Sequence, residues 1–201
     1  NIEIPYGWSI FSSYIQYGEQ NIETLLNSNL ENVIIIKDYF GSVFLPDLNF
    51  NGIGDLDNGQ GYQIKVNQTF TMENCGLTLL PENNPISIPE GWFMFSYLRN
   101  QSSPVDQVLS DISSDVVIVK DYLGSVYLPD LNFNGIGDLH PGQGYQIKSF
   151  LPNTLQYLSN DESYRLSNLP VVDNSVSYYE RSLFTDNNMT IVIEDAAWDV
   201  I

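Results

Sequence analysis

Oxygen-bearing side chains recur at the spacing of a calcium-binding loop in two places along this chain. In each loop they occupy positions 1, 3, 5 and 9, with Gly52 or Gly135 at position 6. A glycine there lets the backbone turn tightly while alternate side chains point at one ion, and hard oxygen ligands suit calcium. The candidate ligands are Asp47, Asn49, Asn51, Asp55, Asp130, Asn132, Asn134 and Asp138.

The same loops also fit an ordinary strand and turn. Position 12 is Asn58 in one loop and Pro141 in the other, so the bidentate glutamate that closes an EF-hand is absent. Leu48 and Phe50 alternate with polar residues as in a half-buried strand, and Asn-Gly is common in tight turns. Calcium binding and a purely structural loop are therefore both open.

Aromatic side chains form a second candidate site, because flat rings can cover the apolar face of a sugar. Trp8 and Trp92 stand at equivalent strand starts, where such residues are usually part of the core. We therefore expect tyrosines rather than tryptophans to bind glycans. The candidates are Tyr39, Tyr62, Tyr122 and Tyr145.

Catalysis has little support in the residue pattern. His140 is the only histidine, and Asp57 stands at the matching position of the other copy, so no Ser-His-Asp or Cys-His arrangement could operate in both. A carboxylate pair such as Asp38 with Asp55 could serve a glycosidase, but acidic residues are too abundant for this to be informative. We expect no enzymatic activity.

The elements that must position these residues belong to an internal repeat. Residues 37–65 and 120–148 differ at only four of 29 positions, and Pro5-Tyr6-Gly7-Trp8 is matched upstream by Pro89-Glu90-Gly91-Trp92. Such self-similarity at a fixed offset is typical of tandem modules.

Each copy reads as a strand, a helix and three further strands. Apolar residues at helical spacing predict helices over 22–30 and 105–112, the second starting at Ser103 and Pro104. The β-branched runs at 33–36 and 116–119 are typical of strands buried on both faces. The remaining strands are predicted at 9–11, 42–45 and 62–65, and at 93–95, 125–128 and 145–148.

The charge balance limits the classes of partner. Twenty-five acidic residues against 7 basic ones give a net charge of -18, which disfavours nucleic acid and anionic membranes as partners.

The chain contains no apolar run of 18 residues, so we expect no membrane span, and Cys75 is the only cysteine, so no internal disulfide can form. Four lysines at equivalent places are expected to pair with carboxylates such as Asp38 and Asp121; they are Lys37, Lys65, Lys120 and Lys148.

Four motifs of the repeat carry a family resemblance. They are Pro-x-Gly-Trp-x-x-Phe-Ser, Val-Ile-Ile-Ile-Lys-Asp, Phe-Asn-Gly-Ile-Gly-Asp and Gly-Gln-Gly-Tyr-Gln-Ile-Lys. Across most of residues 4–149 the chain resembles repeat modules of large secreted proteins from marine Bacteroidota and related metagenomes, and residues 187–198 resemble the opening of a following module. The resemblance implies an extracellular location, and that this chain is a fragment.

These observations predict an α+β fold dominated by strands, built from two tandem strand-helix-three-strand modules with internal pseudo-symmetry. We expect modules at 1–80 and 81–150, then over 151–201 a connector and a terminal strand at 189–193. The expected function is a non-catalytic extracellular structural or adhesive segment that self-assembles through strand pairing and is stabilised by calcium. The alternative is a glycan-binding module of a secreted polysaccharide-processing protein, so the expected partners are further copies of the chain or extracellular glycans.

Overall fold

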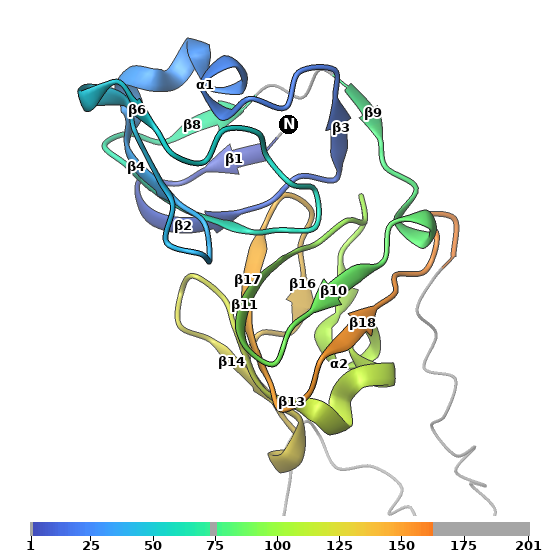
Figure 1. The fold of residues 1–201 in the computed structure, drawn as a ribbon. Coiled ribbons are helices and arrows are strands. Elements are labelled where there is room, and N and C mark those ends of the chain that lie inside the picture. The colour runs from blue at the N-terminus through green and yellow to red at the C-terminus, as the bar shows by residue number, and fades with distance from the viewer. Residues whose placement is uncertain (1, 73–75, 163–201) are drawn as a thin grey trace, which may run out of the picture. The chain divides into compact units, whose positions relative to one another are not determined.

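Two five-stranded antiparallel sheets, one in each repeat, form the framework of this chain (Figure 1). The computed structural model describes residues 2–72 and 76–162, so Cys75 and the terminal strand predicted at 189–193 lie outside the described residues. Both repeats belong to one compact unit that spans Asn1–Ser167.

The first repeat forms a sheet with the strand order β2-β7-β4-β5-β6, and two small sheets, β1-β8 and β3-β9, complete it. Elements marked η are 3-10 helices. In chain order the elements are β1 (Ile2–Ile4), β2 (Gly7–Phe11), β3 (Ile15–Tyr17), α1 (Ile22–Leu25), η1 (Asn27–Asn32), β4 (Val33–Lys37), β5 (Val43–Leu45), η2 (Pro46–Leu48), β6 (Phe50–Asn51), β7 (Tyr62–Val66), β8 (Phe70–Met72) and β9 (Gly76–Thr78).

The second repeat forms an equivalent sheet with the order β11-β17-β13-β14-β15, together with the pairs β10-β18 and β12-β16. Its elements are η3 (Pro81–Asn83), β10 (Ile86–Ile88), β11 (Gly91–Ser96), β12 (Ser103–Pro104), α2 (Val105–Val108), η4 (Ser110–Asp115), β13 (Val116–Lys120), β14 (Val126–Leu128), η5 (Pro129–Leu131), β15 (Phe133–Asn134), β16 (Asp138–Leu139), β17 (Gly144–Ser149) and β18 (Asn153–Leu155). The α+β fold class dominated by strands is confirmed.

The predicted helices are shorter than expected. Each consists of one α-helical turn followed by a 3-10 segment, η1 or η4, whose asparagine, serine and aspartate residues are poor helix formers. Asn21 caps α1 by accepting a hydrogen bond from the Glu23 amide at 3.1 Å. The start predicted for the second helix is wrong, because Pro104 is its N-cap and Ser103 is buried, with its hydroxyl bonded to Arg99.

The strands β4 and β13 are not buried on both faces, contrary to the prediction. The register of each against its neighbour shifts by one residue, between Val33 and Ile35 in the first repeat and between Val116 and Ile118 in the second. This bulge leaves Ile34 40% exposed. A β-branched run thus indicated the strand correctly but not the burial of both of its faces.

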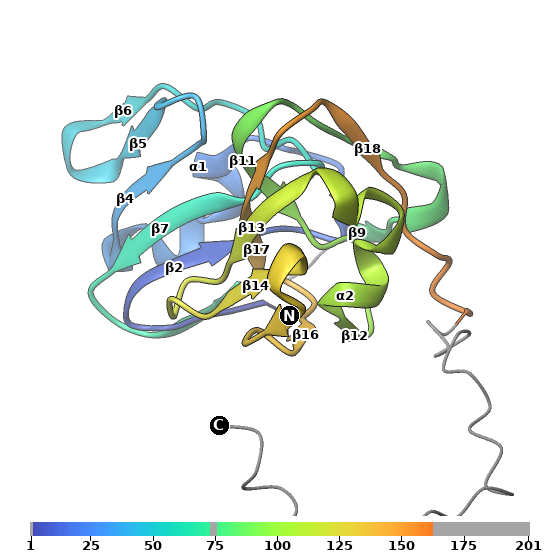
Figure 2. The same cartoon turned by 90° about the horizontal axis from the view of Figure 1, so that it is seen from below.

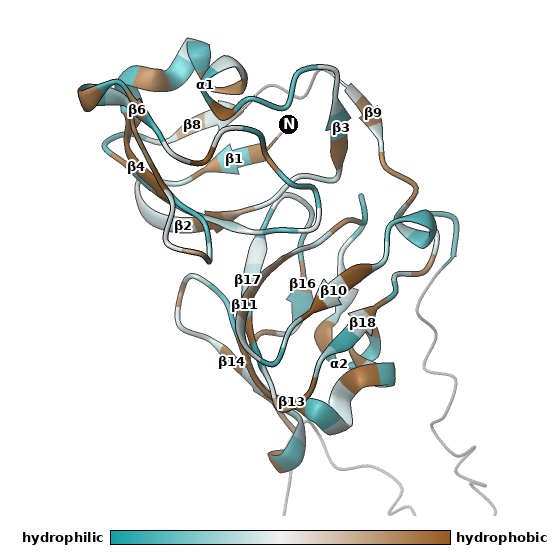
Figure 3. Cartoon of the chain, viewed as in Figure 1, coloured by the Kyte–Doolittle hydropathy of each residue, from teal (hydrophilic) through white to brown (hydrophobic). Residues whose placement is uncertain are grey.

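Each repeat has its own hydrophobic core, on the inner face of its sheet. Phe11, Ile36 and Ile64 lie in the first core, and Phe95 and Val119 lie in the second. Figure 3 shows both hydrophobic and hydrophilic residues on β1 and β3, and the alternation of buried and exposed residues along them is expected for small strands with one buried face. Among the described residues, no helix has the length and apolar character needed to cross a membrane.

The second repeat continues past residue 150, where a connector was expected. Strand β18 pairs with β10, and the Tyr157 hydroxyl donates a hydrogen bond to the Ser96 carbonyl at 2.6 Å. Arg99, whose side chain is buried, donates to the carbonyls of Ser159 and Glu162. Residues 151–162 therefore pack as part of this repeat.

The two repeats meet through reciprocal backbone contacts. The Ser12 amide donates to the Gly142 carbonyl at 3.0 Å, and the equivalent Ser96 amide donates to the Gly59 carbonyl at 3.2 Å. A contact in which each partner uses the same surface is the signature of two-fold symmetry, here within one chain. Strands β2 and β17, which belong to different repeats, consequently lie side by side (Figures 1 and 2).

Gly61 and Gly144 lie at the centre of this interface. A Cβ atom on Gly144 would stand 2.7 Å from Cγ2 of Ile10 and 3.0 Å from both Cα of Gly61 and the carbonyl oxygen of Phe11. A Cβ on Gly61 would stand 3.0 Å from the carbonyl oxygen of Phe95. Only glycine allows the two backbones to approach this closely.

We expect Gly144→Ala to lower the free energy of unfolding by about 1–3 kcal/mol, because the added methyl group forces the two repeats apart. The effect would appear as a fall in Tm in thermal unfolding. Gly18→Ala is the matched control, because a Cβ at Gly18 meets no atom within 4 Å. Equal Tm values for the two variants would contradict this account of the interface.

Candidate functional site

The two loops predicted to bind calcium form tight turns in the structure. Asn49 and Asn132 adopt left-handed backbone conformations, with φ of 48° and 49°, which asparagine tolerates better than most residues. The Asn51 side-chain oxygen accepts a hydrogen bond from the Gly54 amide at 2.8 Å, and Asn134 accepts one from Gly137 at the same distance. Two of the candidate ligands thus already stabilise the turn.

These turns also hold the helices in place. The Gly54 carbonyl accepts a hydrogen bond from the first amide of α1, that of Ile22, at 2.9 Å, and Gly137 does the same for Val105 at 3.0 Å. The half-buried strand that was the alternative to a calcium loop is instead a 3-10 turn followed by the two-residue strand β6, with Leu48 72% exposed. Within residues 2–72 and 76–162, no group of three or more His, Cys, Asp or Glu side chains could hold a metal ion. Calcium binding stays a prediction.

Tyr62 and Tyr145 cannot form a sugar-binding platform, so this part of the prediction is wrong. Their rings are 3% and 1% exposed, and they pack against Phe11 and Phe95 in the two cores. Each hydroxyl accepts a hydrogen bond from a backbone amide, that of Asp57 at 2.7 Å in the first repeat. Burial raises the pKa of Tyr62 to about 12 and also raises that of Tyr145 well above its ordinary value.

Tyr39 and Tyr122, the other two candidates, lie at a different kind of position. Each follows an aspartate in the turn after β4 or β13 and lines a cavity that also contains residues of the other repeat. The Tyr39 ring meets the Phe93 ring edge-on, with 4.6 Å between the ring centres. The two tyrosines therefore bridge the interface between the repeats.

Trp8 and Trp92 lie on the outer faces of their sheets, not in the cores as their positions suggested. Successive side chains along β2 and β11 point to opposite faces of the sheet. Phe11 and Phe95 therefore face inward, while the tryptophans face outward and are 46% and 48% exposed. Paired strands place Trp8 opposite Lys65, and Trp92 occupies the equivalent register. The residues of these strands do not alternate between polar and apolar, since 92–95 reads Trp-Phe-Met-Phe, so the sequence carried no signal that the tryptophans are exposed.

The four equivalent lysines lie over these tryptophan rings, where pairing with Asp38 and Asp121 was expected. The Nζ atoms of Lys37 and Lys65 are 5.3 Å and 5.7 Å from the centre of the Trp8 ring. Those of Lys120 and Lys148 are 5.0 Å and 6.0 Å from Trp92. Cations at this distance are attracted to the indole face and hold each ring in a defined position.

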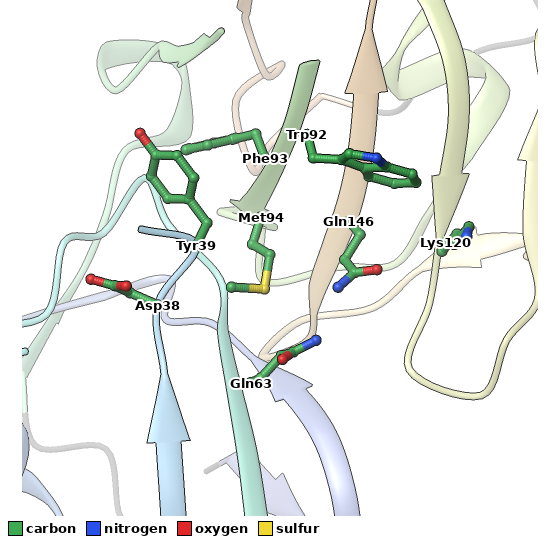
Figure 4. Close-up of a pocket in the computed structure, with 8 residues that line it drawn as sticks. All are labelled: Asp38, Tyr39, Gln63, Trp92, Phe93, Met94, Lys120 and Gln146. Carbon is green, nitrogen blue, oxygen red and sulfur yellow. The ribbon is translucent and has the colours of Figure 1, made fainter. Parts of the chain in front are cut away.

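Two cavities combine these side chains, and each draws on both repeats. The Trp92 pocket, with a volume of about 370 Å³, is lined by Asp38, Tyr39, Gln63, Trp92, Phe93, Met94, Lys120 and Gln146 (Figure 4). The Trp8 pocket, of about 310 Å³, is lined by Trp8, Ser9, Ile10, Lys37, Gln63, Asp121, Tyr122 and Gln146. Exchanging the two repeats converts one set of residue positions into the other.

Gln63 and Gln146 belong to both pockets, since they lie on β7 and β17 close to the interface. Figure 4 shows their side-chain amides between Asp38 on one side and Lys120 on the other. An amide both donates and accepts hydrogen bonds. Each pocket therefore combines a half-exposed indole, a tyrosine, two amides, one carboxylate and one ammonium group.

The carboxylates in the pockets also have a structural role. The Asp38 Oδ1 atom accepts a hydrogen bond from the Ser42 amide at 2.7 Å, and Asp121 accepts one from Ser125 at the same distance.

Asp55, the proposed glycosidase partner of Asp38, instead forms a β-bridge with Asn21. His140 bonds through Nδ1 to the Ser102 hydroxyl at 2.8 Å. The described geometry thus offers each pocket groups for binding rather than a pair of facing carboxylates.

Comparison with known protein families, with curated proteins and with solved structures finds no match to this chain. The family resemblance therefore stays a prediction, and the chemistry of the two pockets rests on their own geometry.

We expect Asn51→Ala and Asn134→Ala to lower Tm in EDTA, because both variants remove the hydrogen bond that closes the turn, and calcium binding by these residues would make the fall in Tm larger in calcium. The loss should be about 1 kcal/mol for each variant, as for other side chains that cap backbone amides. Thermal unfolding in EDTA, in calcium and in magnesium as a control provides the measurement. A destabilisation seen only in calcium would instead identify the loops as metal sites.

The buried Tyr62 hydroxyl makes stability depend on pH in the alkaline range. Its pKa is about 12 in the folded chain against 10.0 ordinarily, so between these values only the unfolded chain has lost the proton. Stability should fall as pH rises through this window, by up to about 1.4 kcal/mol per pH unit for this group. Denaturant unfolding from pH 9 to 12 should show a shallower decline for Tyr62→Phe. Parallel profiles for the variant and the native chain would contradict the expectation.

Proposed function

We propose that this chain is a non-catalytic adhesive segment of a secreted protein, and that it binds neutral glycans in the two pockets between its repeats. The observation that carries the proposal is the paired cavity itself, with a half-exposed tryptophan beside two glutamines in each copy. The extracellular location is part of the proposal and is supported by the resemblance of the four sequence motifs.

The chemistry of the pockets suits a sugar. An indole face can cover the apolar side of a pyranose ring, while amide, carboxylate and ammonium groups bond to hydroxyls that both donate and accept. Volumes of about 370 and 310 Å³ lie at the lower end of the range for small-molecule sites, which suits a short stretch of a glycan.

The charges favour a neutral ligand. Lys120 and Asp38 in the Trp92 pocket balance each other, as Lys37 and Asp121 do in the Trp8 pocket. The net charge of -18 repels a polyanion approaching from a distance. Two sites on one chain also allow multivalent attachment to a polymer, which supports an adhesive role over the binding of a free sugar.

We expect Trp8→Ala and Trp92→Ala each to weaken retention by a polymeric glycan about tenfold, a loss on the scale of 1.4 kcal/mol, because attachment through two pockets becomes attachment through one, and the double variant to abolish it. Affinity electrophoresis through gels containing xylan, laminarin, mannan or soluble cellulose, with alginate as the anionic comparison, would measure this. Phe133→Ala is the control, because this ring is 50% exposed and lies outside both pockets. Retardation should occur with a neutral glycan and not with alginate.

One outcome would favour the rival function. Glycan binding is contradicted if no glycan retards the native chain and if sedimentation velocity shows that the chain self-associates as its concentration rises. The structural alternative, self-assembly through the strand predicted at 189–193, would then be preferred.

A further inference from the structure

The two pockets are equivalent by symmetry but differ in two of their side chains. Ser9 and Ile10 of the Trp8 pocket stand where Phe93 and Met94 stand in the Trp92 pocket. The tryptophan, lysine, aspartate, tyrosine and glutamines are the same in both. The exchange of serine for phenylalanine changes both the volume and the hydrogen-bonding capacity at one point of the wall.

In the Trp92 pocket this point is filled. The Phe93 ring is 6% exposed and meets the Tyr39 ring edge-on. In the Trp8 pocket the equivalent tyrosine, Tyr122, lines the cavity together with Ser9, whose side chain is too small to fill the space of a phenylalanine ring. A second cavity of about 260 Å³ shares Ser9, Ile10 and Tyr122 with the Trp8 pocket and is otherwise lined by residues that include Glu3 and Gln143. We call it the Glu3 cavity.

The Ser9 hydroxyl lies where these two cavities meet. Ser9 is only 4% exposed, and among the described residues its Oγ atom has no hydrogen-bond partner. A buried hydroxyl without a partner is unfavourable, and native proteins seldom leave one unless something else satisfies it. Ser9 and Ile10 are neighbours on the edge strand β2, so their side chains point to opposite faces of the sheet. Because both residues line both cavities, the two cavities together extend around this edge.

We infer that the Trp8 pocket and the Glu3 cavity form one extended subsite for at least two consecutive units of a neutral glycan, with the Ser9 hydroxyl bonded to a sugar hydroxyl at their junction. The Trp92 pocket, where Phe93 occupies the junction, takes a shorter stretch. The Glu3 carboxylate accepts hydrogen bonds from sugar hydroxyls and disfavours an anionic substituent. This inference rests on the proposed function and assigns Ser9 as the residue that distinguishes the two sites.

Isothermal titration with oligosaccharides of two to six units, derived from cellulose, xylan, laminarin and mannan, tests the inference. The Trp92→Ala background isolates the Trp8 pocket, and there we expect affinity to rise as the oligosaccharide lengthens. In that background Ser9→Ala should weaken binding of the longer oligosaccharides about fivefold to tenfold, as expected for one lost hydrogen bond. In the Trp8→Ala background, Ser9→Ala should change nothing.

Stability supplies a second readout. Because the Ser9 hydroxyl has no partner in the described structure, Ser9→Ala should leave Tm unchanged or raise it. A fall in Tm would show that the hydroxyl has a structural role and would overturn the assignment. Ser9→Phe, which reproduces the wall of the other pocket, should remove the gain in affinity with length, provided that its unfolding transition shows it to be folded.

The outcomes separate this inference from the function on which it rests. In the Trp92→Ala background, the affinity could change neither with oligosaccharide length nor on Ser9→Ala. That result would overturn the extended subsite and leave glycan binding intact. Equal weakening by Ser9→Ala in both backgrounds would also overturn it, because the effect would then be indirect. Absence of binding to every oligosaccharide by the native chain would overturn the proposed function and the inference together.

Discussion

The close approach of two glycine backbones is the constraint on which the rest of this structure depends. Gly61 and Gly144 pack against each other where the repeats meet, and a Cβ atom at either position would stand only 3.0 Å from a backbone carbonyl oxygen of the opposite repeat. This contact allows reciprocal hydrogen bonds to form around it, from Ser12 to Gly142 and from Ser96 to Gly59. Two domains that a flexible linker would leave independent are thereby held in one arrangement.

The pockets follow directly from that arrangement. Once the edge strands β2 and β11 lie beside the opposite repeat, the turn after β4 reaches the second sheet and the turn after β13 reaches the first. Tyr39 and Tyr122 each line a cavity together with residues of the opposite repeat. Gln63 and Gln146, only two residues from the central glycines, line both cavities. Cation-π contacts hold the indoles at the rim without burying them.

The strands could be predicted because their signals are local. Aromatic and β-branched runs bounded by turn residues indicated where the main strands of each copy lie along the chain and the α+β class, and the repeat indicated two copies of it. The bulge at Ile34 could not be predicted, since it depends on how β4 is registered against a strand almost thirty residues away. The site was partly missed for the same reason. Burial separates Tyr62 from Tyr39, and the cavity exists only between repeats.

Neither copy of the repeat contains a complete pocket, since each cavity takes its indole from one copy and its tyrosine from the other. The smallest segment of chain that forms a complete cavity is consequently a pair of repeats. Duplication of a single copy would lengthen the protein and add a folded core without adding a cavity, whereas duplication of the pair would add two. An array built from such modules would gain cavities in steps of two, and a lost repeat would leave its surviving neighbour without a complete cavity.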